Sequence, residues 1–247
     1  MKIEISFKDM MEIYEFASQG KLIEGLVHNL NGQLQNINME VEMMMHHSVK
    51  AARKSQDNLS NKFNSGLKKV DELITYINND IKTFIINAGV YDESSGYISL
   101  NEFIRSELQS LKVNLYFKHN VHQELQLKET SPLIRNLPKR FCQAFRWFLQ
   151  AFAEELERTK IQQIRVKTYD GPSGINIILS SEKISLSKKF LKLLKTDIPS
   201  SRPLTTDKNT VGILLSLAIF KSEGGAVTCS DESSGSNITF VIPVPYS

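Results

Sequence analysis

The sequence has few of the features that mark secreted, membrane-spanning or nucleic-acid-binding proteins. It has two cysteines, Cys142 and Cys229, in 247 residues, which argues against a disulfide framework and fits a reducing cytoplasm. The N-terminus lacks the apolar core of a signal peptide, and no stretch reaches the roughly 18 apolar residues of a membrane span. A formal net charge of +3 gives no electrostatic case for binding nucleic acid or a membrane. We therefore expect a cytoplasmic globular protein of one or two domains.

An amphipathic helical stretch near the N-terminus carries a histidine. Its apolar positions recur at helical spacing on one face, at Leu22, Leu26, Leu30, Leu34, Ile37, Val41 and Met44. His28 falls roughly opposite that face. An imidazole on the wet side of a rigid helix is available as a nucleophile or proton carrier. We predict one long helix over residues 7–52.

The end of this helix, residues 39–47, is rich in methionine and histidine. Thioether and imidazole groups are soft ligands that suit copper or zinc. Methionine at helical spacing is more often a flexible core residue, so we predict no metal site here.

A second amphipathic helix follows a polar stretch, residues 55–65, that is typical of a hairpin turn. Its apolar positions alternate three- and four-residue steps, at Phe63, Leu67, Val70, Ile74, Ile77, Ile81, Phe84 and Ala88. Because two such helices bury little surface alone, the pattern predicts a homodimer whose hairpins pair as a four-helix bundle. A polar break at residues 92–96 closes this module.

From residue 98 onward, short strand and helix patterns alternate. Strands are expected at residues 115–117, 122–127, 164–168, 175–179, 226–230 and 238–243, helices at 99–107, 138–156, 186–194 and 211–222, and a polar loop at 199–210. The order predicts an α+β chain. A helical hairpin, residues 1–96, precedes an α/β sandwich, residues 97–247, with helices on one side of its sheet.

Residues 17–31, ASQGKLIEGLVHNLN, resemble the phosphoacceptor helix of bacterial sensor histidine kinases of the nitrogen-regulation type. In that family the pattern Gly-x-Leu-x-x-Gly-x-x-His-Glu/Asp-x-Asn-Asn surrounds the phosphorylated histidine, and the match places this role at His28. Residues 98–247 resemble the family's ATP-binding (GHKL) domain, most strongly at 98–104, 141–156 and 211–243. The resemblance implies a dimeric phosphoacceptor hairpin followed by a histidine-kinase-type ATPase fold.

The positions that hold MgATP in this family are altered here. The Asn-x-x-x-Asn-Ala box carries Arg146 and Gln150 in place of the two asparagines, and the extra methylene of a glutamine displaces its amide from a magnesium ion. The Asp-x-Gly-x-Gly box becomes a segment around Ser181 without Asp or Gly. The Gly-x-Gly-Leu turn keeps Gly212 but has Leu214 where bare backbone is needed. We therefore expect neither ATP nor Mg²⁺ on this chain.

Two departures also occur beside the histidine. Asn29 replaces the acidic residue that serves the family as general base, and a neutral amide cannot accept that proton. Gly32 stands where Asn or Thr would orient water for the phosphatase reaction. The resemblance thus implies weakened kinase and phosphatase chemistry and a retained phosphoacceptor.

The leading hypothesis is a histidine phosphotransferase of a two-component phosphorelay. It would exchange a phosphoryl group between His28 and the aspartate of a response-regulator receiver domain, with Mg²⁺ held by the receiver. Lys21, Glu24, Asn31 and Gln35 share the exposed side of the helix with His28 and are candidate receiver-docking residues. Each of them is equally well explained as part of an ordinary solvated face.

Two other hypotheses stay open. The chain is alternatively a non-catalytic pseudokinase adaptor that binds a receiver or a kinase without phosphotransfer, as the departures at Asn29 and Gly32 favour. A third interpretation is an active soluble sensor histidine kinase, which predicts labelling of His28 from ATP.

Overall fold

A computed structural model describes residues 7–51, 57–89, 97–130, 133–135, 139–182, 184–196, 208–232 and 235–243. The chain divides into two compact units. We call Gln19–Gly89 the hairpin unit, and Met1–Ser18 together with Val90–Ser247 the sheet unit. The predicted polar break at 92–96 lies outside the described residues, and the domain boundary between residues 96 and 97 stays a prediction.

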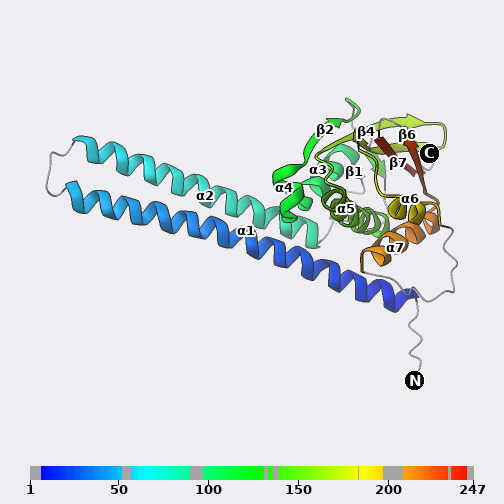
Figure 1. Ribbon diagram of the computed structural model, residues 1–247, viewed down its shortest axis with the longest axis horizontal. Coiled ribbons are helices and arrows are strands. Elements are labelled where there is room, and N and C mark those ends of the chain that lie inside the picture. Colours follow the sequence, from blue (N-terminus) through cyan, green and yellow to red (C-terminus); the bar gives the residue numbers. More distant parts are fainter. Residues whose placement is uncertain are drawn as a thin grey trace, which may run out of the picture. The chain divides into compact units, whose positions relative to one another are not determined.

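The hairpin unit consists of α2 (Asp57–Gly89) and the part of α1 (Phe7–Ala51) from Gln19 onward, and the two helices run antiparallel (Figure 1). They approach closely at Gly66, where a Cβ atom would lie 2.6 Å from the Cγ atom of Met44. Nearby, the Lys69 ammonium donates a hydrogen bond of 3.0 Å to Glu40. The predicted long helix over residues 7–52 is confirmed over residues 7–51, and residue 52 lies outside the described residues.

The predicted turn at residues 55–65 is wrong from residue 57 onward, because α2 begins at Asp57. Residues 57–65 contain neither glycine nor proline, the residues that most often end a helix. Polar composition alone therefore predicted a turn that is too long.

Much of the hairpin unit's apolar surface is exposed in the single chain. The exposed large apolar side chains are Ile23, Val27, Leu34, Met39, Val41, Met43 and Met45 of α1, and Phe63, Leu67, Ile74 and Tyr76 of α2. Phe63, Leu67 and Ile74 belong to the predicted coiled-coil seam. This seam is therefore not covered within one chain.

The sheet unit contains a mixed five-stranded sheet of order β2-β4-β5-β7-β6. Its strands are β2 (His122–Gln126), β4 (Gln163–Gly171), β5 (Gly174–Glu182), β6 (Ala226–Glu232) and β7 (Gly235–Ile242). The β2 and β4 strands pair in parallel and the other neighbours pair antiparallel. A small separate sheet, which the sequence did not predict, pairs β1 (Tyr97–Ser99) with β3 (Leu133–Arg135).

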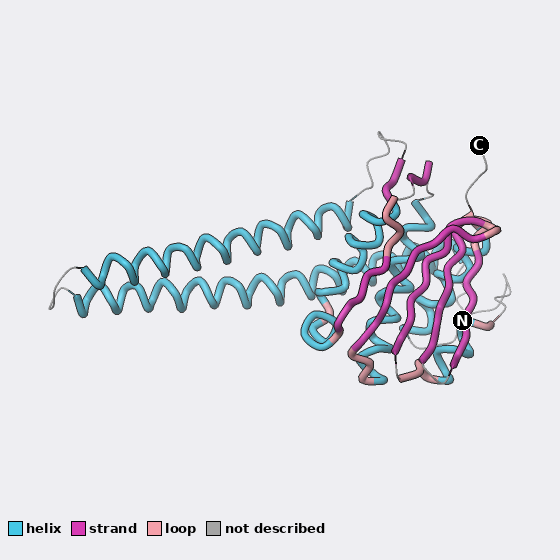
Figure 2. The backbone as a smooth tube through the Cα atoms, turned by 90° about the horizontal axis from the view of Figure 1, so that it is seen from above, coloured by secondary structure: helices cyan, strands magenta, loops and turns pink. Residues whose placement is uncertain are grey.

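Helices cover one face of the five-stranded sheet, as predicted (Figure 2). They are α3 (Leu100–Ser110), α4 (Leu115–Asn120), α5 (Lys139–Thr159), α6 (Lys188–Leu194) and α7 (Lys208–Ser222), with a 3₁₀ turn, η2, at Leu111–Val113. No helix among the described ranges is long and apolar enough to cross a membrane.

The core of this unit centres on Phe240 of β7. Its ring packs edge-on against Phe148 of α5 at 4.7 Å and against Phe145 at 5.2 Å between centroids, and Phe220 of α7 lies at 5.2 Å. These rings are buried, and aromatic contacts of this geometry add to the stability gained by burial. They fix α5 and α7 against the sheet.

Two further predictions needed correction or extension. The predicted strand at 115–117 is wrong, because Asn114 caps a helix there by accepting a hydrogen bond of 2.8 Å from the Phe117 backbone N–H. Most of the predicted loop at 199–210 lies outside the described residues, and its last residues, 208–210, already belong to α7.

Candidate functional site

The proposed phosphoacceptor lies in the hairpin unit, in the middle of α1. The His28 side chain is exposed, as are those of Lys21, Glu24, Asn31 and Gln35. Their three- and four-residue spacing places these five residues on one stripe of the helix. The stripe presents a nucleophile, charges of both signs and two amides to solvent.

Gly32 of α1 faces open space. A Cβ atom built there has no neighbouring atom within 4 Å, so packing does not require a glycine at this position. Asn29, beside the histidine, is partly buried.

The nucleotide-site positions lie in the sheet unit, and Arg146 of α5 is committed to a buried ion pair. Its guanidinium donates to both carboxylate oxygens of Glu107 on α3, at 3.0 and 2.8 Å. The Glu107 carboxylate is 0% exposed. A bidentate pair of this kind holds both groups in one geometry, which leaves Arg146 a structural role between α3 and α5.

Gln150, one turn further along α5, contacts the beginning of α1. The Ser18 hydroxyl donates a hydrogen bond of 2.8 Å to the Gln150 side-chain oxygen. The side-chain nitrogen of Gln150 is buried and has no hydrogen-bond partner in the described part of the chain. The side-chain oxygen of Gln150, which is the atom that would ligate a magnesium ion, thus already accepts a hydrogen bond from the protein.

Gly212 and Leu214 belong to α7, which begins at Lys208, so they form helix where the family has a phosphate-binding turn. Leu214 is buried. A Cβ atom at position 212 would lie 2.6 Å from Cζ of Tyr14 and closer still to the phenol oxygen. The space beside this glycine is therefore filled by a tyrosine of α1.

Ser181, at the end of β5, links two strands. Its hydroxyl accepts a hydrogen bond of 3.1 Å from the Ser236 backbone N–H and donates to the Ser236 carbonyl at 3.4 Å. The residue is buried. It supports the β5–β7 pairing and offers no carboxylate to a ligand.

The structure brings Gln150 and Gly212 together through the first turns of α1, whereas Arg146 and Ser181 have partners elsewhere in the sheet unit. Sequence reasoning missed Tyr14 and Ser18, which make these contacts. The available signal was the spacing of Met10, Tyr14 and Ser18, which places them on one helix face.

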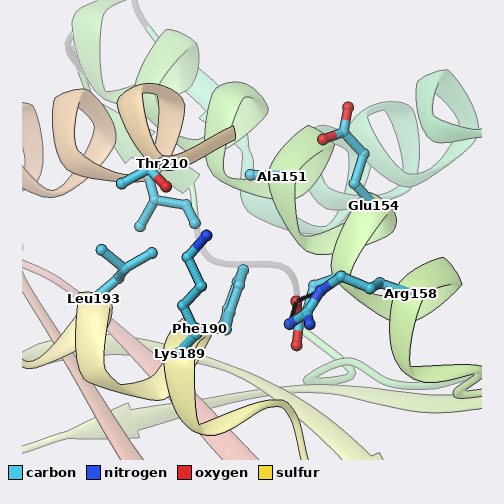
Figure 3. Close-up of a pocket in the computed structure, with 9 residues that line it drawn as sticks. Ala151, Glu154, Arg158, Lys189, Phe190, Leu193 and Thr210 are labelled. Atoms are coloured by element: carbon cyan, nitrogen blue, oxygen red, sulfur yellow. Dashed lines mark hydrogen bonds and ion pairs between the residues drawn. The ribbon is translucent and has the colours of Figure 1, made fainter. Parts of the chain in front are cut away.

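A cavity of about 190 Å³ lies between α5, α6 and α7 (Figure 3). Its lining comprises Ala151, Glu154, Glu155 and Arg158 of α5, Lys189, Phe190 and Leu193 of α6, and Thr210 and Ile213 of α7. Glu155 is already engaged, because it pairs with Arg158 and accepts a hydrogen bond of 2.8 Å from the Ser187 N–H. The cavity is smaller than the roughly 300 Å³ at which small-molecule sites begin.

Neither cysteine is a candidate nucleophile. Burial raises the pKa of the Cys142 thiol to about 12, and it also raises the pKa of Cys229. Since the thiolate is the reactive form, both are poorly reactive at neutral pH. Among the described residues, no group of His, Cys, Asp and Glu is placed to hold a metal ion.

No family model and no curated protein matches the sequence. Among solved structures, the chain is similar to a bacterial phosphotransferase, with 12% identity, a TM-score of 0.47, and coverage of 96% of this chain and 97% of that one. It is also similar to the Acinetobacter baumannii histidine kinase AdeS, with 15% identity, a TM-score of 0.44, and coverage of 91% and 98%. The catalytic domain of histidine kinase ThkA matches with 18% identity, a TM-score of 0.45, and coverage of 60% and 94%. At TM-scores below 0.5, these likenesses assign no activity to this chain.

Replacing Arg146 by methionine should destabilise the sheet unit. The substitution leaves the Glu107 carboxylate buried without its counter-charge, which typically costs about 3–5 kcal/mol. Urea unfolding measures the loss, and the double variant R146M/E107L should recover most of it. As a control, Arg165 pairs with both Glu124 and Glu182, and these three side chains are 22–37% exposed. R165M should therefore give a much smaller loss. Equal losses for R146M and R165M would contradict the assignment.

Tyr14 should ionise at unusually high pH. Burial raises the pKa of Tyr14 from 10.0 to about 12, so the folded protein favours the neutral phenol. The contribution of Tyr14 to stability is then fully present below pH 10 and is lost as the pH rises toward about 12. The ultraviolet absorbance of tyrosinate, taken as the difference between the parent chain and Tyr14→Phe, should show this late transition. A midpoint near 10 would show that the phenol is not buried.

Proposed function

We propose that this chain is a two-component signalling protein that exchanges a phosphoryl group between His28 and the aspartate of a receiver domain without binding ATP. One observation carries the proposal. The His28 imidazole is exposed in the middle of a long helix, within a segment whose sequence resembles phosphoacceptor helices.

The chemistry requires little from this chain beyond position. A ring nitrogen of His28 attacks the phosphorus of the receiver's aspartyl phosphate, and the N–P bond forms as the P–O bond to the carboxyl group breaks. The electron pair of that bond leaves on the aspartate as a carboxylate, and the reverse step returns the phosphoryl group. Because the receiver supplies Mg²⁺, an accessible and correctly oriented imidazole provides most of what remains.

The stripe around His28 supports receiver docking. Lys21, Glu24, Asn31 and Gln35 are exposed with the histidine, so a receiver can contact them while its aspartate approaches the imidazole. Lys21 suits an acidic partner surface and Glu24 suits a basic one, which gives a docked receiver one preferred orientation.

The contacts of the nucleotide-site positions support the absence of ATP. Arg146 is paired with Glu107, Gln150 with Ser18, and Gly212 lies against Tyr14. A nucleotide would have to displace these protein contacts, and it would find no Asp at the Ser181 position to recognise adenine.

The uncovered seam of the hairpin unit supports a homodimer. Phe63, Leu67 and Ile74 are exposed at coiled-coil spacing. Pairing two hairpins as a four-helix bundle would bury this surface. We propose that the functional unit is this dimer, with no nucleic-acid or membrane partner.

His28→Gln should abolish acceptance of phosphate, because the amide offers no nucleophilic nitrogen. The assay incubates the chain with receiver domains phosphorylated by acetyl phosphate and measures acid-labile label on this protein. His46 lies exposed on the same helix, so His46→Gln is the matched control and should keep full acceptance. Label on His28→Gln at the parent level would reject the proposal.

Calorimetric titration with a non-hydrolysable ATP analogue and Mg²⁺ should give no binding heat at millimolar nucleotide. The physical reason is that the groups needed for adenine and Mg²⁺ are replaced or engaged. Micromolar affinity would instead favour an active kinase, and labelling of His28 from ATP would then be the decisive assay.

Light scattering should show a dimer at micromolar concentration. Ile74→Glu places a charge in the seam and should shift the protein toward monomer. Tyr76, which is also exposed on α2 but lies outside the seam, gives the control Tyr76→Glu, which should stay dimeric. A monomeric parent chain would contradict the bundle.

The adaptor remains the second candidate, since Asn29 lacks the general base and Gly32 lacks a side chain although there is room for one. An adaptor predicts that His28→Gln binds the receiver with parental affinity and keeps its signalling output in cells. Loss of output with binding retained would favour phosphotransfer.

A further inference from the structure

The first turns of α1 dock against α5 and α7 within the sheet unit. Met10, Met11 and Tyr14 pack against the core of that unit. The Tyr14 ring meets Trp147 of α5 edge-on, with centroids 5.0 Å apart and an interplanar angle of 79°. One helical turn later, Ser18 donates its hydrogen bond to Gln150. A single face of α1 thus makes both apolar and polar contacts.

Gly212 of α7 allows this face of α1 to approach closely, because it has no side chain. A Cβ atom there would lie 2.6 Å from Cζ of Tyr14, which is too close without movement of the tyrosine. A glycine inside a helix lowers helix stability by about 1 kcal/mol relative to alanine. The space that Gly212 leaves for the Tyr14 phenol accounts for its presence. By contrast, Gly20 and Gly32 of α1 have no neighbouring atom within 4 Å of a built Cβ.

The docked segment is held on one side only. Ile13 and Phe16, on the opposite side, are 58% and 74% exposed. The hydrogen bonding between this segment and α5 is also incomplete, since the buried side-chain nitrogen of Gln150 has no hydrogen-bond partner among the described residues. Segments with few buried contacts open at lower free energy than the core that they cover.

We propose that residues 10–18 are a reversible latch, in which Tyr14 seats beside Gly212 and whose release uncovers a surface formed by Trp147, Gln150 and Gly212. In the closed state the occupant of this α5–α7 surface is the chain's own helix. In the open state the surface offers an indole, an amide and a notch that fits an aromatic ring. This inference rests on the contacts of the sheet unit and does not depend on the function proposed for His28.

Trp147 is the single tryptophan of the chain, so its fluorescence reports the latch directly. Gly212→Ala in the 247-residue chain should push Tyr14 out, shift the emission to longer wavelength and raise quenching by acrylamide several-fold. Amide exchange of residues 10–18 should accelerate in the same variant. In a Tyr14→Ala background no ring stands beside position 212, so adding Gly212→Ala should change neither signal further.

Matched controls separate the latch from general loosening. Gly32→Ala adds the same methyl group where there is space, and Phe16→Ala removes an exposed ring from the latch itself, so both should leave Trp147 quenching unchanged. Tyr14→Ala opens the latch from the other side, and circular dichroism checks that each variant is folded. Parental quenching and exchange in both Gly212→Ala and Tyr14→Ala would overturn the proposal, as would a further full-sized change when Gly212→Ala is added to Tyr14→Ala.

Discussion

The packing of α5 on the sheet determines how the rest of the sheet unit is arranged. Phe145 and Phe148 lie against Phe240 of β7, which fixes the rotation of α5 about its axis. Since side chains repeat on a helix face every three or four residues, this rotation turns Arg146, Trp147 and Gln150 away from those rings. What these three residues can bind is then decided by their neighbours from α3, α7 and the beginning of α1.

Those neighbours are all protein groups. Glu107 forms an ion pair with Arg146, and Ser18 donates a hydrogen bond to Gln150. Tyr14 contacts both Trp147 and Gly212. The sequence resemblance assigns Arg146, Gln150 and Gly212 to a nucleotide site, and in the structure each of them contacts a protein side chain. None of these contacts involves the exposed histidine of the hairpin unit.

Local periodicity predicted most of the secondary structure. The long helix before residue 52, strands β4 and β5, and helices α3, α5, α6 and α7 follow from apolar spacing and turn residues. Helix α4 was missed because the β-propensity of residues 115–117 gave no sign of the cap at Asn114. The exposure of His28 was also predictable, since its position opposite the apolar face needs only helical geometry.

The contacts of Arg146 and Gln150 were not predictable in this way. Ser18 and Gln150 are 132 residues apart, and Arg146 and Glu107 are 39 apart, so no local pattern links them. The sequence showed that Arg146, Gln150 and Gly212 depart from or only partly keep a nucleotide-binding pattern. It did not show which side chains these three residues contact, because those contacts depend on tertiary packing between distant segments.

The most direct test of this account compares two phosphoryl donors on the same protein. The chain is incubated in parallel with γ-labelled MgATP and with receiver domains that carry labelled aspartyl phosphate, and acid-labile label is mapped by mass spectrometry. The account predicts phosphohistidine at His28 from a receiver and none from ATP. Phosphohistidine formed from ATP, or none formed from any receiver, would contradict it.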